Sequence, residues 1–430
     1  MVELRDFYDE IYNCLQCGFC LAKCPVHREE RVEPVLARGQ MNLARALLDG
    51  ELKPSRKMEE LFYMCQLCTQ CTEGCPSNVH TANVMIAARA ELAKHRPIPF
   101  VKKLIFNAMK NPGKMSTLVK LGALGQSLFF KKKENMCHER IPVLFGSDRL
   151  LPRLSGRSLF DQLPEVVKVR DARMRVAYFT GCFTTYVDNE VGHAVLRTLT
   201  RNGIEVVVPK KQQCCGIPIL AHGDLQGGLS LLRRNIELLA GLDVDYIVVD
   251  CTSCGSTLTE LPEVFLKDAG EEFAAKAEKV KGKLYEVTEF LAEVAGFDKE
   301  LGELGLKVTY HVPCHRNWSQ VDGIRSGPRK LMEAIPGVTL VEMKEPEWCC
   351  GAAGSHMLTH YELASRIRDR KLVDIASTGA DLVMSPCPGC RMHIKDGLNQ
   401  KKMHQDTIHP IQILDKAYEA AAPREMKKAN

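Results

Sequence analysis

Two cysteine runs of identical spacing constrain the fold of this chain more than any other feature. The first is a C-x2-C-x2-C-x3-C-P run and consists of Cys14, Cys17, Cys20, Cys24 and Pro25. The second repeats it with Cys65, Cys68, Cys71, Cys75 and Pro76. Four thiolates that converge on one inorganic core hold a [4Fe–4S] cubane, and in two-cluster ferredoxins the fourth ligand comes from the other run. The spacing therefore predicts two clusters, one on Cys14, Cys17, Cys20 and Cys75 and the other on Cys65, Cys68, Cys71 and Cys24.

The alternative is a scaffold held together by structural zinc sites, because C-x2-C also occurs in zinc knuckles. Zinc takes four ligands in two pairs, which leaves the third closely spaced cysteine and the Cys-Pro step unexplained. Between the two runs, Arg38–Leu48 and Met58–Tyr63 have helical composition and periodicity. We therefore expect residues 1–95 to form an α-helical two-cluster ferredoxin domain.

From about Arg173 the cysteines form a duplicated unit. The first copy contains Cys182, Cys214-Cys215-Gly216 and Cys251-x2-Cys254. The second copy contains Cys314, Cys349-Cys350-Gly351 and Cys387-x2-Cys390. Corresponding cysteines lie about 135 residues apart throughout, and a near-constant offset is the signature of an internal repeat.

Apolar runs of strand length precede the cysteines in both copies. Met174–Phe179 corresponds to Leu306–His311, and Tyr246–Asp250 corresponds to Leu382–Pro386. Segments of helical pattern lie between them, namely Glu190–Asn202, Leu225–Leu239, Arg325–Ala334 and Glu362–Ser377. We expect two α/β repeats with mainly parallel sheets, at 173–300 and 301–430, so that the whole chain is an α+β multidomain protein. Open α/β sheets bind ligands beyond the carboxyl ends of their strands, so each repeat should gather five thiolates at one sheet edge.

Five cysteines exceed the four that a cubane needs, and two of them are adjacent. Side chains of neighbouring residues diverge, so both can reach one site only through a special turn or around a larger cluster. Gly216 and Gly351 follow the pairs and can supply that turn through a positive φ or a close backbone approach. The pattern favours one or two non-cubane [4Fe–4S] clusters beside the two cubanes. Eighteen of the 19 cysteines are then ligands, and Cys137 is left as a spare buried or linker thiol.

The duplicated C…CCG…C-x2-C pattern resembles the cysteine-rich (CCG) domain shared by heterodisulfide reductase, the iron–sulfur subunits of glycolate or lactate oxidases, and anaerobic glycerol-3-phosphate dehydrogenase. Cys349–Gly354, Pro386–Cys390 and Ile408–Leu414 are most similar to the glycolate/lactate branch. That branch implies an electron-relay subunit that serves a separate FAD-containing 2-hydroxy acid dehydrogenase. Heterodisulfide reductase implies non-cubane clusters that break disulfides, and two complete five-cysteine repeats keep this alternative open.

The segment 96–172 reads as a basic helical linker. Lys94–Lys133 contains ten Lys or Arg and no acidic residue, while Phe100, Val101, Leu104, Ile105, Ala108 and Met109 recur at helical spacing. Such a helix can lie on an anionic membrane surface near a quinone pool or dock an acidic partner. Alternatively, it is a connector that packs its apolar face on its own domain.

Composition excludes several other classes of function. The formal charge of +5 is too small to suggest a nucleic-acid partner, and no apolar run is long enough to span a bilayer. The opening residues do not resemble a secretory signal, and numerous cysteines in a reducing compartment favour metal ligation, so we expect a cytoplasmic protein, with peripheral contact to the cytoplasmic membrane face as an option.

No nucleotide or flavin motif is present, because Gly227-Gly228 lacks the context of a dinucleotide-binding turn. Substrate oxidation is therefore expected on a partner flavoprotein, with a quinone or electron-transferring flavoprotein as the acceptor. No catalytic residue is assigned. His311 and His315, beside Cys314, either donate hydrogen bonds or protons at a cluster or are structural, and the same holds for His222 and His356 near the CCG turns. Trp318 and Trp348 are interpreted as packing residues.

Overall fold

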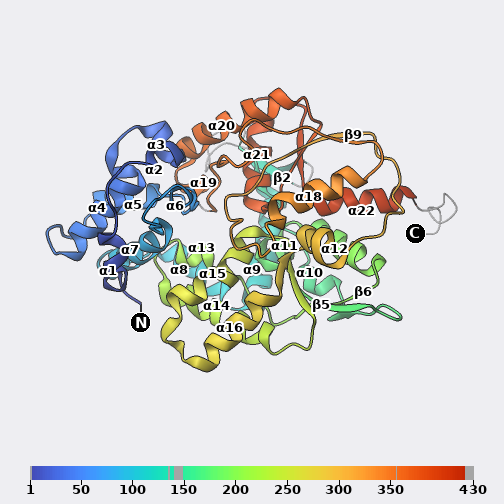
Figure 1. The fold of residues 1–430 in the computed structure, drawn as a ribbon, viewed down its shortest axis with the longest axis horizontal. Coiled ribbons are helices and arrows are strands. Elements are labelled where there is room, and N and C mark those ends of the chain that lie inside the picture. Colours follow the sequence, from blue (N-terminus) through green and yellow to red (C-terminus); the bar gives the residue numbers. More distant parts are fainter. Residues whose placement is uncertain (1, 134–135, 140–148, 355, 422–430) are drawn as a thin grey trace.

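The N-terminal domain is built from helices only. The computed structural model describes residues 2–133, 136–139, 149–354 and 356–421. The main helices of this domain are α1 (Tyr8–Tyr12), α2 (Cys20–Lys23), α3 (Pro25–Glu30), α4 (Ala37–Leu48), α5 (Arg56–Met64), α6 (Gln70–Glu73) and α7 (Thr81–His95). α4 and α5 confirm the two helices expected between the cysteine runs. In Figure 1 they lie at one end of the molecule, beside the two α/β units.

The segment after α7 is only partly helical. It contains α8 (Phe100–Met109) and α9 (Pro112–Phe129), and α9 begins where the Asn111 side chain accepts a hydrogen bond from Lys114 N at 3.1 Å. A small antiparallel sheet follows, formed by β1 (Phe130–Lys133), β2 (Met136–Glu139) and β3 (Leu151–Pro152). Cys137 is buried in β2, where its thiol faces the Leu151 carbonyl at 3.6 Å, which confirms a spare buried thiol.

The first repeat is a five-stranded sheet of order β4-β6-β5-β7-β8. Its strands are β4 (Val166–Val167), β5 (Met174–Phe179), β6 (Ile204–Val207), β7 (Tyr246–Val249) and β8 (Leu284–Glu286). All neighbours are parallel except β4, which adds antiparallel to β6. The segment predicted as linker thus supplies an edge strand to this sheet. The helices are α11 (Gly181–Tyr186), α12 (Asn189–Arg201), α13 (Ile217–Leu220), α14 (Leu225–Ala240), α15 (Thr252–Phe265) and α16 (Glu271–Lys283).

The second repeat has the same strand order. β10 (Val338–Leu340), β9 (Leu306–Tyr310), β11 (Leu382–Met384) and β12 (Asp406–Ile408) lie side by side and are all parallel. Its helices are α18 (Gly323–Ala334), α19 (His356–Thr359), α20 (Tyr361–Thr378), α21 (Pro388–Gln400) and α22 (Pro410–Ala421). In both copies the first strand lies between the second and the third, so the duplication and the mainly parallel sheets are confirmed.

The repeats share a hydrophobic core. Buried apolar residues of β5, α12 and β6 belong to one cluster with residues of β9 and α22. A second cluster joins the N-terminal helices to the first repeat and includes Phe62, Met85, Leu220 and Phe265. Buried apolar surface contributes roughly 25 cal/mol per Å². The three parts are therefore packed as one body, which fixes the positions of their cysteines relative to one another.

Candidate iron–sulfur sites

The five cysteines of the first repeat meet at the carboxyl ends of β5, β6 and β7, and we call this group site A. Cys182 lies in α11 after β5, Cys214-Cys215 precede α13, and Cys251 and Cys254 lie at the start of α15 after β7. Hydrogen bonds with the thiols of Cys182 and Cys215 raise the pKa of Cys214, and hydrogen bonds from Cys214 and Cys254 lower that of Cys215. The five thiols therefore form one contiguous group, as the strand pattern predicts.

The second repeat builds an equivalent group, site B, from Cys314, Cys349, Cys350, Cys387 and Cys390. A hydrogen bond with Cys349 and then burial raise the pKa of Cys314. Cys350 accepts from both Cys349 and Cys390, which lowers its pKa. All cysteines of the two sites are buried except Cys182 and Cys314, which are partly exposed.

The glycine after each cysteine pair makes the turn possible. Gly216 has φ +103° and Gly351 has φ +83°, values that a residue with a side chain rarely adopts. A Cβ on Gly216 would lie 2.6 Å from the Gly228 carbonyl oxygen, and one on Gly351 would lie 2.5 Å from that of Ala364. The positive φ and the close backbone approach that were expected of these glycines are therefore confirmed at both sites. The turn lets two adjacent cysteines face one centre.

The chemistry of these donor sets fits a cationic metal group. Thiolates are the required form for metal binding, yet the pKa is raised at five of these thiols, namely Cys214, Cys251, Cys254, Cys314 and Cys390. Site B also has a buried cation beside it, because Lys371 is 1% exposed and feels the charges of Cys350 and Cys349. Iron can displace the protons, and Lys371 can offset the remaining negative charge.

The N-terminal cysteines lie in two groups. Burial raises the pKa of Cys24 to about 12, and the nearby charges of Cys68 and Cys65 add to this effect. Cys71 likewise feels the charges of Cys68, Cys65 and Cys24, so this set comes together as the crossed ligand scheme requires. In the other set, burial raises the pKa of Cys20, and the nearby charge of Cys14 adds to this effect. The membership of Cys17 and Cys75 in that set stays a prediction of the motif.

The second N-terminal set adjoins site B. A hydrogen bond with the Cys349 thiol is the largest effect on the raised pKa of Cys68, and Cys314 also contributes. Gln66 accepts a hydrogen bond from Cys349 Sγ at 3.3 Å and donates one to the Gly351 carbonyl at 3.2 Å. Sequence spacing alone could not place Cys68 beside Cys349.

Sites A and B also adjoin each other. Ser253 Oγ, in the C-x2-C loop of site A, lies 3.9 Å from Cys387 Sγ of site B. The Cys387 charge contributes to the raised pKa of Cys251. The described cysteines therefore run from the N-terminal domain through site B to site A, and neighbouring groups of cysteines lie close to one another.

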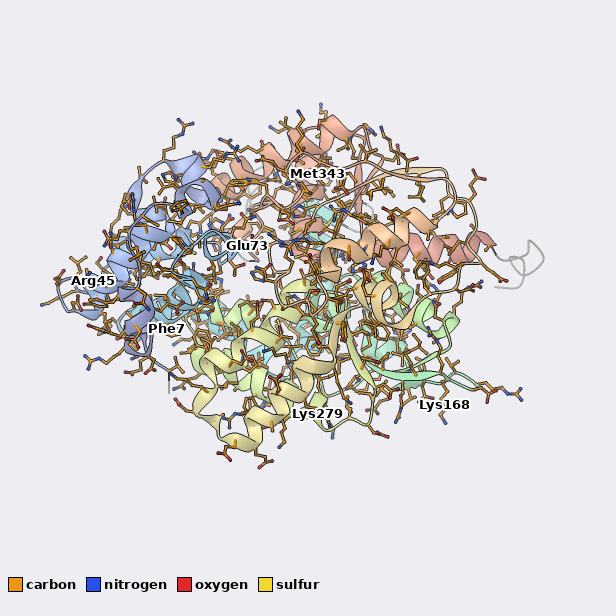
Figure 2. All side chains as sticks on the ribbon, viewed as in Figure 1. Phe7, Arg45, Glu73, Lys168, Lys279 and Met343 are labelled. Atoms are coloured by element: carbon orange, nitrogen blue, oxygen red, sulfur yellow. The ribbon has the colours of Figure 1, made fainter. Side chains whose placement is uncertain are left out.

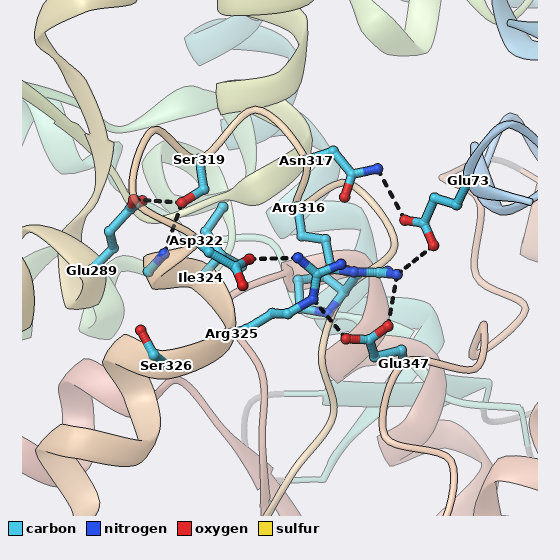
Figure 3. A network of polar contacts seen from close by, with 12 residues as sticks. Glu73, Glu289, Arg316, Asn317, Ser319, Asp322, Ile324, Arg325, Ser326 and Glu347 are labelled. Carbon is cyan, nitrogen blue, oxygen red and sulfur yellow. Dashed lines mark hydrogen bonds and ion pairs between the residues drawn. The ribbon is translucent and has the colours of Figure 1, made fainter. Parts of the chain in front are cut away.

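An ion-pair network holds the second repeat against the N-terminal domain. Figure 2 shows Glu73 between the helical domain and the α/β units, and Figure 3 shows its partners. Arg316, 1% exposed, donates to Glu73 at 2.7 Å and to Glu347 at 2.9 Å, while Asn317 donates to Glu73 at 2.9 Å. These residues were not among the sequence candidates, because no local pattern distinguishes an interdomain arginine from a surface one.

The candidate histidines have different surroundings. His315 Nε2 lies 2.9 Å from the Leu67 carbonyl, so this ring bridges the second repeat and the N-terminal domain. His222 stacks on Tyr63, and His356 stacks on His360. His311 is buried within site B, and burial lowers its pKa to about 3, so the ring is neutral.

The tryptophans pack as expected. Trp318 lies directly against Gly255, one residue after Cys254, since a Cβ there would meet the indole ring at 2.0 Å. Trp348 stacks on the Arg28 guanidinium, whose Cζ lies 4.5 Å from the ring centroid. Both rings therefore fill the junctions between parts of the chain.

A small cavity beside Cys182 and Cys214 opens beneath the α8–α9 connection. Met109, Pro112, Met115 and Phe160 line it together with the two cysteines, and its volume is about 10 Å³. Site A therefore lies next to α8 and α9. Among the described residues, no helix is both long and apolar enough to cross a bilayer.

Comparison with known proteins identifies the domains. The 4Fe-4S dicluster domain matches residues 10–79, and the CCG cysteine-rich domain matches twice, at 176–259 and 308–395. An uncharacterized iron–sulfur protein of Methanococcus maripaludis is 30% identical over 96% of this chain and 74% of its own length. The chain belongs to the CCG family of iron–sulfur proteins.

Other relatives of this CCG protein are oxidoreductase subunits. A probable glycolate oxidase iron–sulfur subunit of Bacillus subtilis is 27% identical, with 96% of this chain and 94% of the relative covered. One subunit of the dihydromethanophenazine:CoB–CoM heterodisulfide reductase of Methanosarcina mazei is 26% identical, with 95% and 94% covered. The resemblance inferred from the cysteine pattern is thus confirmed, and the CCG protein has an oxidoreductase-associated role.

Proposed function

We propose that this CCG protein is the iron–sulfur electron-transfer subunit of a 2-hydroxy acid oxidoreductase of the glycolate/lactate class. Its donor is an FAD-containing dehydrogenase subunit, and its acceptor is a quinone or another carrier such as electron-transferring flavoprotein. The observation that carries the proposal is the proximity of successive ligand sets, because Cys68 hydrogen-bonds with Cys349 and the charge of Cys387 acts on Cys251. Iron–sulfur clusters bound to these ligand sets would take up and release single electrons, and neighbouring ligand sets would let the electrons pass from one cluster to the next.

The first N-terminal set offers an entry point for electrons. Cys17 is exposed, and the neighbouring Leu15 and Phe19 are 72% and 66% exposed. The ten cysteines of sites A and B are by contrast mostly buried, which excludes water and competing oxidants. We propose two cubane clusters on the crossed N-terminal sets and non-cubane clusters in sites A and B, because each site presents five thiols with an adjacent pair.

The helices above site A favour a membrane-bound acceptor. Only the C-terminal part of the apolar face of α8 is packed, since Ala108 is buried, whereas Phe100 is 80% exposed, Val101 67% and Leu104 56%. α9 adds Leu121, Leu124, Leu128 and Phe129, each more than 60% exposed. With Lys103, Lys114, Lys131 and Lys132 beside them and no acid in the segment, an anionic lipid surface suits these helices.

Vesicle flotation tests this contact. The double variant Leu121→Asp, Leu124→Asp should leave vesicles that contain anionic lipid, and so should removal of Lys131 and Lys132. Val373→Asp is the matched control, because Val373 is 73% exposed on α20 in another part of the molecule. Unchanged flotation of the α9 variants would refute the membrane contact.

The electron-transfer role is tested with the native complex. The protein should co-purify with a flavoprotein, and addition of glycolate or lactate should bleach the cluster absorbance. Absence of both the flavoprotein and hydroxy-acid-dependent bleaching would overturn the proposal.

Reduction of a disulfide at a non-cubane cluster is the second candidate. Two complete five-cysteine sites and the heterodisulfide reductase relative favour it. The reduced, isolated protein would then be reoxidised by a disulfide. Inertness toward a panel of disulfides would exclude this function.

A further inference from the structure

We propose that His311 is an additional protein ligand to iron in site B. This inference rests on the proposed iron–sulfur content of that site. It concerns the position just after β9, where the chain leaves the sheet toward Cys314. The imidazole would bind through one ring nitrogen beside the thiolates of Cys350 and Cys390.

The first observation is the placement of the ring. One nitrogen of His311 and the sulfurs of Cys350 and Cys390 lie within 4.8 Å of one another, and all three residues are buried. Metal–nitrogen and metal–sulfur bonds measure roughly 2.0 and 2.3 Å, so donor atoms so spaced can share one metal atom. Cysteine and histidine are also donors that iron accepts together in proteins.

The second observation is that no side chain of the described residues holds the ring by a hydrogen bond. His311 is 1% exposed, and neither Nδ1 nor Nε2 makes a hydrogen bond within the described part of the chain. Leaving a buried polar group without a partner is unfavourable, and a metal ion would remove this cost. The Pro346 backbone is close enough to influence the ring, and a backbone carbonyl commonly accepts a hydrogen bond from the second nitrogen of a metal-bound histidine.

The third observation is the difference between the two repeats. The residue equivalent to His311 in the first repeat is Phe179, which is completely buried. A Cβ on Gly181 would lie 3.0 Å from Cys254 Sγ and 3.9 Å from Phe179 Cε1, so the phenyl ring occupies the corresponding place beside site A. Packing is thus satisfied by an apolar ring there, whereas site B has a nitrogen donor instead. The two sites should differ in spectrum and in affinity for iron.

The test uses the full chain, purified without oxygen and labelled with ¹⁵N-histidine. Hyperfine spectroscopy of the site B signal should detect a directly bound histidine nitrogen in the wild type and lose it in His311→Phe. Cys350→Ser identifies which signal belongs to site B. His356→Phe is the matched control, because it removes another buried histidine whose ring nitrogens have no hydrogen bond in the described residues, and it should keep the coupling.

A second measurement does not depend on a paramagnetic state. His311→Phe should release site B iron to a chelator roughly tenfold faster or more, while the N-terminal clusters are unaffected. Release of site B iron from His311→Phe at the wild-type rate would overturn the ligand assignment alone. So would a wild-type protein whose site B contains iron but shows no coupling to a histidine nitrogen. A wild-type site B without iron would overturn both the assignment and the proposed cofactor content.

Discussion

Replacing Gly351 by alanine tests the turn that brings two adjacent cysteines to one centre. The added Cβ would lie 2.5 Å from the Ala364 carbonyl oxygen and 3.2 Å from Ile367 Cβ, at a φ of +83°. This clash is relieved only if the turn moves away from α20, and Cys349 and Cys350 then move with the turn. The change should therefore weaken site B and leave the N-terminal clusters intact.

The magnitude follows from two separate costs. A left-handed backbone conformation costs a residue with a Cβ roughly 1–2 kcal/mol, and overpacking typically costs about 1–3 kcal/mol. Gly351→Ala incurs both, or about 2–5 kcal/mol. Gly354→Ala, in the same loop at φ +58°, incurs only the first, because nothing lies within 4 Å of its added Cβ. The difference of about 1–3 kcal/mol corresponds to roughly 5-fold to 150-fold in an equilibrium constant.

The assay is local, since a chain of several domains need not unfold in one step. Site B iron and its spectrum are followed at increasing chelator concentration in the wild type and both variants. Gly351→Ala should lose site B at a concentration at least fivefold lower than Gly354→Ala. Equal loss in the two variants would refute the close-approach argument, and equal loss in Gly351→Ala and the wild type would refute the role of the turn.

Three further predictions concern the junction, a buried acid and the sites themselves. Arg316→Met removes the cation that Glu73 and Glu347 share, so that Glu347 keeps only its pair with Arg325 among the described residues, and it should lower the midpoint of denaturant unfolding through a loss of about 1–3 kcal/mol in the free energy of unfolding, whereas an unchanged midpoint would contradict the network of Figure 3. Burial raises the pKa of Glu286 from 4.5 to about 8, so the folded chain keeps a proton that the unfolded chain releases, and stability is lost as pH rises through this range. Glu286→Gln should therefore gain stability over the wild type by a few kcal/mol between pH 6 and 8, and a pH-independent gap would show that Glu286 does not titrate there. Cys215→Ser should abolish the spectrum of the site A cluster and leave the other spectra unchanged. If neither Cys215→Ser nor Cys350→Ser changes any cluster spectrum, the repeats hold no clusters.

The sequence predicted those features that depend on local spacing. Helices α4, α12, α14, α18 and α20 and the parallel strands follow from apolar periodicity, and the cysteine groups follow from strands that end at one sheet edge. The role of the glycines in the CCG turns was predictable because a special turn is one of the ways in which two adjacent cysteines can face one site. These inferences need only a few consecutive residues and the rules of α/β sheets.

What the sequence could not predict depends on how the parts dock. Cys68 and Cys349 are about 280 positions apart in the sequence, yet their thiols interact. Arg316 is buried between Glu73, about 240 positions before it, and Glu347, about 30 positions after it. The amphipathic pattern of α8 was visible, but only the packing of the domains leaves Phe100 and Val101 exposed. Likewise, the sequence shows only that His311 is near a cysteine. Its burial beside Cys350 and Cys390, with neither ring nitrogen hydrogen-bonded to the described residues, is what makes it a ligand candidate.

Iron and acid-labile sulfide analysis of protein purified without oxygen, combined with Mössbauer spectroscopy, tests the central claim most directly. The account predicts roughly 12 to 16 iron atoms per chain with matching sulfide, in two cubane clusters and at least one further cluster of different spectrum. A colourless protein that contains zinc, or no metal with its cysteines joined in disulfides, would contradict it.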